Sequence, residues 1–240
     1  MKVQQNYYFL VNLKEALSSL QNIGVLLDLD GVVYQGGSLI HGAVETVHIL
    51  KHNNIPYRFI TNTARMTKKN LVRKLRSMGL SIEINEVFAA PHAAVEYCKS
   101  REYTTIDLVV PDKEMEEDFS DFDLNVESPQ AVVLGDMGPG FTFDLLNSLF
   151  KKILNGAELV AMHKNKYWHS GGELTLDLGA FVSALEFSAE KEAVLIGKPS
   201  PYLFQLAVKP WEIPFQSIYM VGDDVDGDIG GANNVGMKSI

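Results

Sequence analysis

The chain has 240 residues, a net charge of −9, 46% hydrophobic and 21% charged residues, so it is long enough for one large domain or two smaller ones with buried cores. The negative charge argues against an extended nucleic-acid surface, and no apolar run approaches the roughly 20 residues of a membrane helix, so we expect neither partner. Cys98 is the only cysteine, which excludes an intrachain disulfide and favours a cytoplasmic location.

The first third of the chain alternates between strand and helix patterns. Residues 23–30, IGVLLDLD, form an apolar run typical of a buried strand, residues 42–54 carry apolar residues at helical spacing, and residues 55–61 form a second short β-rich run. A basic helix within residues 66–79 and a strand near residues 84–88 follow. Strands that alternate with helices predict right-handed βαβ units and a parallel sheet.

A second α/β pattern occupies the middle of the chain. Residues 105–110, 130–135 and 157–162 predict strands, and residues 141–156 and 178–190 predict helices, the first of which is closed by Gly156. This segment has enough apolar residues for its own core. We therefore expect an inserted α/β domain at residues 91–192, between two parts of a first domain at residues 1–90 and 193–240. The chain ends inside the expected last strand, so a weakly anchored edge strand is expected there.

Polar residues follow several of these strands, and ligands of open parallel sheets bind beyond the carboxyl ends of the strands. Asp28 and Asp30 come directly after the first strand. Alternate residues of an extended chain point the same way, so the two carboxylates would share a site if the strand persists to Asp30. At about 4 Å they would repel by roughly 4 kcal/mol at an effective dielectric of 20. A positive partner is expected, unless one aspartate caps the turn and the other is solvated.

Two further strand ends carry groups that suit a phosphate. Thr61 and Asn62 follow the second strand, where a hydroxyl, an amide and backbone N–H groups fit a phosphate oxygen as well as an ordinary helix cap. Lys198 lies between Gly197 and Pro199, and the proline restricts the lysine backbone to extended conformations. Its ammonium can therefore be aimed at a phosphate, although a surface lysine is the commoner case for such a residue alone.

A cluster of aspartates follows the last long strand. Asp223, Asp224, Asp226 and Asp228 crowd a glycine-rich turn, and such a concentration of like charge predicts a bound cation. Mg²⁺ with oxygen ligands is the natural candidate. A calcium loop of the EF-hand type is disfavoured, because that pattern needs a glutamate at its last position and flanking helices.

The motifs DLDGV, TN, GKP and GDDVDGD, in this order, resemble the four motifs of the haloacid dehalogenase superfamily of phosphatases. The long segment between the second and third motifs is similar to the large α/β cap of the NagD-like subfamily IIA. The stretches FITNTAR, AELVAMHKNKYW and GELTLDLGAFVSALEF are most similar to the phospholysine/phosphohistidine inorganic pyrophosphate phosphatase branch. The resemblance runs from about Gly24 to the last residue and implies a Rossmann-like core with an inserted cap domain.

The resemblance also implies roles for the residues of these motifs. Asp28 would attack phosphorus to form an aspartyl-phosphate, and Asp30 would act as acid and then as base. Lys198 would neutralise Asp28 and the phosphate. The Mg²⁺ would be bound by Asp28, the backbone carbonyl of Asp30 and Asp223. The remaining predicted site residues are Thr61 and Asn62, which would hold phosphoryl oxygens, and Asp224 and Asp228, which would support the metal or Lys198.

The cap is expected to choose the substrate through residues 163–172, HKNKYWHSGG, a polar and aromatic hairpin or loop. The side chains predicted to contact a phosphorylated leaving group are those of His163, Lys164, Tyr167 and His169. A solvated turn with Trp168 packed against the cap sheet explains the same stretch equally well. Histidine ligation of a metal is disfavoured, because no further His or Cys completes a known spacing.

Three functions remain in competition. The leading hypothesis is a Mg²⁺-dependent phosphatase that hydrolyses a small phosphorylated metabolite or a phosphoramidate. The alternatives are a phosphate-binding scaffold that has lost turnover and a phospho-accepting signalling receiver. The complete set of acidic residues argues against the scaffold, and the long insertion argues against the receiver. The resemblance allows a homodimer, and the substrate stays open because cap loops vary around a fixed chemistry.

Overall fold

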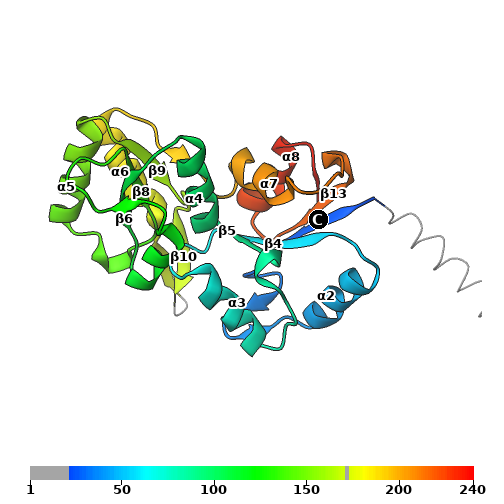
Figure 1. Cartoon of the computed structure of the whole chain (residues 1–240). Coiled ribbons are helices and arrows are strands. Elements are labelled where there is room, and N and C mark those ends of the chain that lie inside the picture. Colours follow the sequence, from blue (N-terminus) through cyan, green and yellow to red (C-terminus); the bar gives the residue numbers. More distant parts are fainter. Residues whose placement is uncertain (1–21, 171–172) are drawn as a thin grey trace, which may run out of the picture.

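The protein contains two five-stranded sheets (Figure 1). The computed structural model describes residues 22–170 and 173–240. We call the first one the core sheet, and its strands are, in spatial order, β14 (Lys238–Ser239), β13 (Ile218–Val221), β1 (Gly24–Leu27), β4 (Tyr57–Thr61) and β5 (Val87–Ala89). We call the second one the cap sheet, and its strands are β12 (Val194–Leu195), β9 (Glu158–Ala161), β8 (Ala131–Leu134), β6 (Thr105–Val109) and β7 (Asp123–Leu124). Neighbouring strands in both sheets are parallel, which confirms the predicted α/β class.

Helices surround both sheets (Figure 1). They are α2 (Ala43–His52), α3 (Lys68–Ser77), α4 (Ala90–Ser100), α5 (Phe143–Leu154), α6 (Leu178–Ala189), α7 (Pro201–Val208) and α8 (Gly231–Asn234). Local sequence signals set their ends. Thr67 caps α3 by accepting a hydrogen bond from the backbone N–H of Asn70, and Thr142 caps α5 in the same way. Gly156 adopts a φ of +111° just after α5, as its predicted role at the helix end requires.

Shorter elements complete the fold. Two hairpins are formed by β2 (Tyr34–Gln35) with β3 (Ser38–Leu39) and by β10 (Tyr167–Ser170) with β11 (Glu173–Leu176). The second hairpin is one of the two forms expected for residues 163–172. Short 3₁₀ helices occur at η1 (Ile84–Glu86), η2 (Lys113–Phe119), η3 (Gly138–Gly140) and η4 (Phe215–Ser217), and a π-helical turn, η5 (Val225–Gly230), precedes α8. The strand expected near residues 84–88 begins only at Val87, because η1 occupies the first residues.

The order of the core sheet brings distant parts of the chain together. β1 lies in the centre and pairs with β4 on one side and with β13 on the other. Neighbouring residues of β1 point to opposite faces, so Leu26 packs toward the core that is continuous with the cap, and Leu27 packs toward α2 and α3. The carboxyl ends of β4, β1 and β13 therefore lie side by side, although their residues are far apart in the sequence.

The predicted domain bounds stay a prediction, but the pairing of β12 concerns the second of these bounds. β12 pairs with β9 in the cap sheet, although its residues follow the expected boundary at 192. The chain thus leaves the cap sheet only after Leu195, three residues before Lys198. The last strand, β14, has two residues and lies at the edge of the core sheet, as expected. Among the described helices, none combines the length and the apolarity that crossing a membrane requires.

The stability of the cap sheet can be tested at its centre. Leu134 is fully buried in β8, between β6 and β9, so Leu134→Ala is expected to lower the free energy of unfolding by about 2–5 kcal/mol. Leu154→Ala is the matched control, because Leu154 is 53% exposed at the end of α5, and a change within about 0.5 kcal/mol is expected. Urea unfolding measures both. Equal effects of the two substitutions would contradict this arrangement.

Candidate active site

The four predicted motifs meet at the carboxyl end of the core sheet. Asp28 follows β1 directly, Thr61 is the last residue of β4, and Asp223 comes two residues after β13. The backbone N–H of Asp28 donates to the carbonyl of Val221, so the chain after β1 stays paired with β13. Lys198 arrives from the loop between β12 and α7. The parallel core sheet thus explains why Asp28, Thr61 and Asp223 share one place, while Lys198 reaches it from the end of a strand of the cap sheet.

Lys198 lies between two buried carboxylates. Its Nζ is 2.6 Å from Oδ1 of Asp28 and 2.6 Å from Oδ1 of Asp228, and the Asp228 side chain is fully buried. Burial disfavours the charged form of an acid, so the pKa of Asp28 and that of Asp228 are raised even though Lys198 opposes the shift. Burial also opposes the charge of Lys198, but the two carboxylates outweigh it and raise the pKa of the ammonium.

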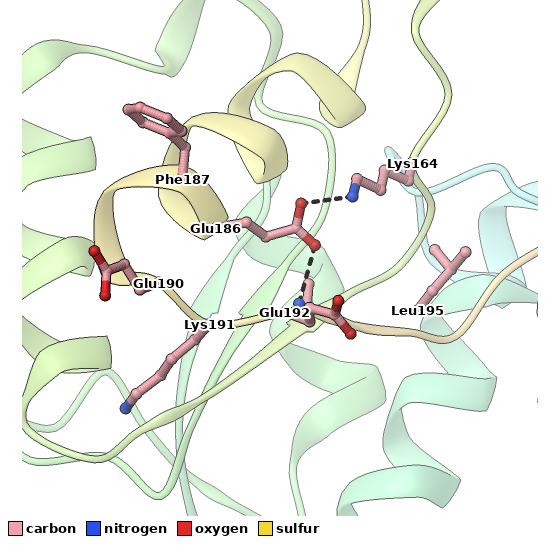
Figure 2. A pocket seen from close by; sticks show the side chains of 8 residues that line it. Lys164, Glu186, Phe187, Glu190, Lys191, Glu192 and Leu195 are labelled. Atoms are coloured by element: carbon pink, nitrogen blue, oxygen red, sulfur yellow. Dashed lines mark hydrogen bonds and ion pairs between the residues drawn. The ribbon is translucent and has the colours of Figure 1, made fainter.

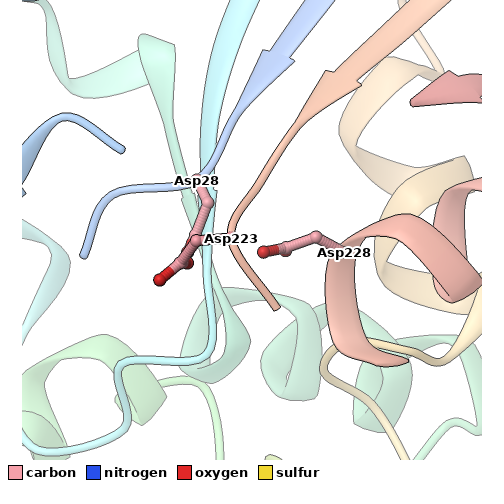
Figure 3. A group of neighbouring side chains, drawn as sticks. All are labelled: Asp28, Asp223 and Asp228. Atoms are coloured by element: carbon pink, nitrogen blue, oxygen red, sulfur yellow. The ribbon is translucent and has the colours of Figure 1, made fainter. Parts of the chain in front are cut away.

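Three aspartates form a cluster of oxygen ligands beside this lysine (Figure 3). Single carboxylate oxygens of Asp28, Asp223 and Asp228 lie within 4.8 Å of one another. Figure 3 shows Asp228 pointing from η5 toward the strand ends that carry the other two. When ionised, three carboxylates against one ammonium leave two negative charges uncompensated. An all-oxygen set with that charge suits a hard divalent cation such as Mg²⁺, so the residues fit the predicted metal.

Gly31 allows the cluster to be this tight. Its φ is +85°, and a Cβ at this position would lie 2.1 Å from Oδ2 of Asp223. A side chain would therefore both strain the backbone and displace a carboxylate of the cluster. The glycine of the first motif is thus explained by the close approach of Asp223.

Asp30 lies outside this carboxylate cluster. β1 ends at Leu27, so the extended chain does not persist to Asp30, and the simple alternation that would have stacked the two carboxylates is wrong. Asp30 is exposed, and its backbone forms an isolated β-bridge with Tyr34. Burial first, then the charges of Asp30 and Asp28, raise the pKa of Tyr34 to about 12. Tyr34 was not predicted as a neighbour of the site.

The two residues of the second motif, Thr61 and Asn62, make different contacts. Thr61 is buried, and its hydroxyl lies 2.9 Å from the hydroxyl of Thr63. The Asn62 side chain binds the backbone of Lys198 twice: Oδ1 accepts from the lysine N–H at 2.7 Å, and Nδ2 donates to the lysine carbonyl at 2.9 Å. The predicted phosphate contact of this amide therefore competes with a structural one.

The two supporting aspartates of the fourth motif have different surroundings. Asp228 contacts Lys198, as described above, and also accepts at Oδ2 from the N–H of Asp224 at 3.2 Å. The Asp224 side chain instead caps η5, because its Oδ1 accepts from the N–H groups of Asp226 and Gly227 at 3.0 Å each. Asp224 thus shapes the turn that presents Asp228.

The predicted cap residues do not converge on the carboxylate cluster as a group. His163 is buried, and burial lowers its pKa to about 4. The Lys164 ammonium lies 2.5 Å from the Glu186 carboxylate, in a groove of about 500 Å³ (Figure 2). None of the three clustered aspartates lines this groove. Tyr167 is 55% exposed on the hairpin, and His169 pairs with Leu174 across it, while the side chain of His169 lies outside the described part of the chain.

Sequence reasoning missed a contact between the core and the cap. Arg65 follows the second motif, and its Nε donates to Oδ2 of Asp136, after β8, at 2.6 Å. Its guanidinium also lies over the ring of Trp168, 4.9 Å from the ring centre. The only signal in the sequence was the position of Arg65 three residues after Asn62, since nothing linked it to an aspartate of the inserted segment.

Comparisons with known proteins place the chain in one family. Residues 25–125 match the model of a haloacid dehalogenase-like hydrolase family, and residues 195–240 match a second, HAD-hydrolase-like model. The chain is 34% identical over 232 residues to phospholysine phosphohistidine inorganic pyrophosphate phosphatase of Rattus norvegicus, covering 94% of this chain and 84% of that protein. It is also 34% identical over 216 residues to haloacid dehalogenase-like hydrolase domain-containing protein 2 of the same organism, covering 90% and 82%.

Solved structures of known proteins share the fold of this chain. A 4-nitrophenylphosphatase from Thermotoga maritima superposes with a TM-score of 0.84 at 27% identity, over 92% of this chain and 85% of that one. NagD from E. coli K-12 superposes with a TM-score of 0.81 at 19% identity, over 90% and 85%. The predicted fold, a Rossmann-like core with an inserted α/β cap, is thereby confirmed.

The buried ion group can be tested without any assay of function. Lys198→Met leaves Asp28 and Asp228 buried without their cation, so we expect the free energy of unfolding to fall by about 3–5 kcal/mol. Lys99→Met is the control, because the Lys99–Asp121 pair is largely exposed and should contribute no more than about 1 kcal/mol. Chemical unfolding at constant pH measures both. A Lys198→Met protein as stable as the wild type would show that the two carboxylates do not need the ammonium.

Proposed function

Because the chain belongs to the haloacid dehalogenase-like hydrolase family, we propose that it is a Mg²⁺-dependent phosphatase that hydrolyses a small phosphorylated metabolite through an aspartyl-phosphate. The observation that carries this proposal is Asp28, held by the buried Lys198 and grouped with Asp223 and Asp228. The phosphatase names of its relatives in sequence and in structure support the same activity.

Asp28 is the proposed nucleophile. Its carboxylate stands at the end of the central strand, where Lys198 fixes one of its oxygens. An oxygen of this carboxylate attacks phosphorus, a new O–P bond forms, and the bond from phosphorus to the leaving group breaks. A carboxylate suits this task because the acyl phosphate that it forms is reactive enough to be hydrolysed.

Asp30 is the proposed acid and base. It follows Asp28 by two residues and is exposed, whereas Asp28 is buried, so the two carboxyl groups have the different surroundings that separate roles require. Asp30 first gives its proton to the oxygen of the leaving group. It then takes a proton from the water that attacks the aspartyl-phosphate, which releases phosphate and restores Asp28.

The remaining residues bind and orient. Thr61 and Lys198 would hold phosphoryl oxygens, and Asn62 holds the backbone of Lys198, so we assign it to positioning rather than to phosphate contact. Asp28, Asp223 and the backbone carbonyl of Asp30 would bind Mg²⁺. When bound, this ion supplies the positive charge that allows a carboxylate to approach a phosphate anion.

The names of the relatives support a proposal for the substrate class. One of them is named for phospholysine, phosphohistidine and inorganic pyrophosphate, and others are named 4-nitrophenylphosphatases. We therefore propose a small phosphate ester, a phosphoramidate or pyrophosphate as the substrate. A cytoplasmic location and a homodimer stay predictions.

The experiment that tests this function is phosphate release from 4-nitrophenyl phosphate. Asp28→Asn keeps the shape of the side chain but removes the nucleophile, so we expect the rate to fall about 1,000-fold or more. A chelator should abolish the wild-type activity, and added Mg²⁺ should restore it. Asp226→Asn is the control, because Asp226 is exposed on the same turn, and it should keep the wild-type rate.

Two results would contradict the proposal. Asp28→Asn protein that turns over at the wild-type rate would exclude Asp28 as nucleophile. Folded wild-type protein that binds Mg²⁺ and releases no phosphate from a panel of esters, phosphoramidates and pyrophosphate would favour the phosphate-binding scaffold instead.

A further inference from the structure

We infer that Asn165 of the cap is a positioning residue that fixes Lys198 through Asn62. This inference rests on the proposed function and concerns the same site. The cap would thereby hold one part of the proposed catalytic group in place. The contacts that carry it run from the cap loop after β9, through the loop after β4, to the loop that carries Lys198.

Asn62 is the centre of this chain of contacts. Both polar atoms of its side chain bind the backbone of Lys198, at 2.7 Å and 2.9 Å. Its Nδ2 also donates to Oδ1 of Asn165 at 3.4 Å. The amide orientation that serves Lys198 is therefore the one that places Nδ2 toward the cap. Loss of the acceptor in the cap would leave the Asn62 amide without its third contact, so that only the lysine backbone would fix its orientation.

The backbone of Asn165 is itself held in place. Its carbonyl accepts from the N–H of Gly179, at the start of α6, at 2.9 Å. A Cβ on Gly179 would lie 2.5 Å from the carbonyl oxygens of both Lys164 and Asn165, so the helix and the loop are in direct contact there. Asn165 is thus presented to Asn62 by the first turn of a cap helix rather than by a free loop.

Gly197 gives independent support for a junction at this place. A Cβ on Gly197 would lie 2.2 Å from the carbonyl oxygen of Met162 in the cap and 2.5 Å from Oδ1 of Asn62. The residue before Lys198 is therefore packed between the cap and the second motif with no space for a side chain. Movement of the cap strand end would be transmitted to this glycine and to Lys198.

The expected effect is on the reaction rather than on the binding of substrate. Lys198 holds Asp28 through a 2.6 Å contact, and small displacements of reacting groups lower rates strongly. We expect Asn165→Ala to lower kcat for 4-nitrophenyl phosphate about tenfold and to change KM less than about twofold. Asn165→Asp keeps an oxygen acceptor for Asn62 and should stay within about threefold of the wild-type kcat. Lys166→Ala, an exposed neighbour in the same loop, is the control and should be unchanged.

A double-mutant cycle decides whether Asn165 acts through Asn62. If it does, the Asn62→Ala/Asn165→Ala protein will be no slower than Asn62→Ala alone. Two results would overturn the inference. One is a double mutant that is slowed by the product of the two single effects, and the other is an Asn165→Ala protein with wild-type kcat or with a raised KM alone.

Failure of the proposed function would be seen separately, because wild-type protein would then release no phosphate. The same cycle measured by urea unfolding still tests the contact in that case. Coupled residues should give a double mutant whose unfolding equilibrium constant departs at least about threefold from the product of the single effects. Effects that simply multiply would show that Asn62 and Asn165 are independent.

Discussion

The rest of the structure is arranged around the buried ammonium of Lys198, which lies between two buried carboxylates. Lys198 is almost fully enclosed, and its Nζ is 2.6 Å from both Asp28 and Asp228. Removing such charges from water costs several kcal/mol per ion, and their attraction repays this only with good geometry. Around this group the chain supplies the carboxyl end of a parallel sheet, a π-helical turn that presents Asp228, and the cap junction at Gly197. We interpret this energetic cost as consistent with the proposed phosphatase site, in which these charged groups would act on a phosphate.

The surrounding residues serve this group in two ways. Some make room for it, as Gly31 does for the carboxylate of Asp223. Others orient it, as Asn62 does by binding both the N–H and the carbonyl of the Lys198 backbone. Asp224 is of the second kind, because its side chain caps η5 and so fixes the turn from which Asp228 points. The sequence motifs therefore contain residues that position other residues as well as residues that are proposed to react.

Much of the fold and of the central site could be predicted from the sequence. Buried apolar runs followed by polar residues predict parallel strands whose ends meet, and this physical rule places Asp28, Thr61 and Asp223 together. Lys198 also follows a strand, but this strand belongs to the cap sheet. Loops were harder. The alternation argument failed at Asp30, because β1 ends at Leu27, the last residue that it pairs with β13 and β4. The ion pair of Lys164 with Glu186 had no signal in the sequence, since spacing alone does not fix which way a loop side chain turns.

The central claim is that Asp28 forms a covalent bond to phosphorus during the reaction. The most direct test is to mix the wild-type protein and Mg²⁺ with a substrate that carries labelled phosphate, to stop the reaction in acid within one turnover, and to map the label by mass spectrometry of peptides. The account predicts an acid-stable, base-labile label on the peptide that contains Asp28, and none in Asp28→Asn protein. Label on another residue, or turnover without any labelled protein at early times, would contradict it.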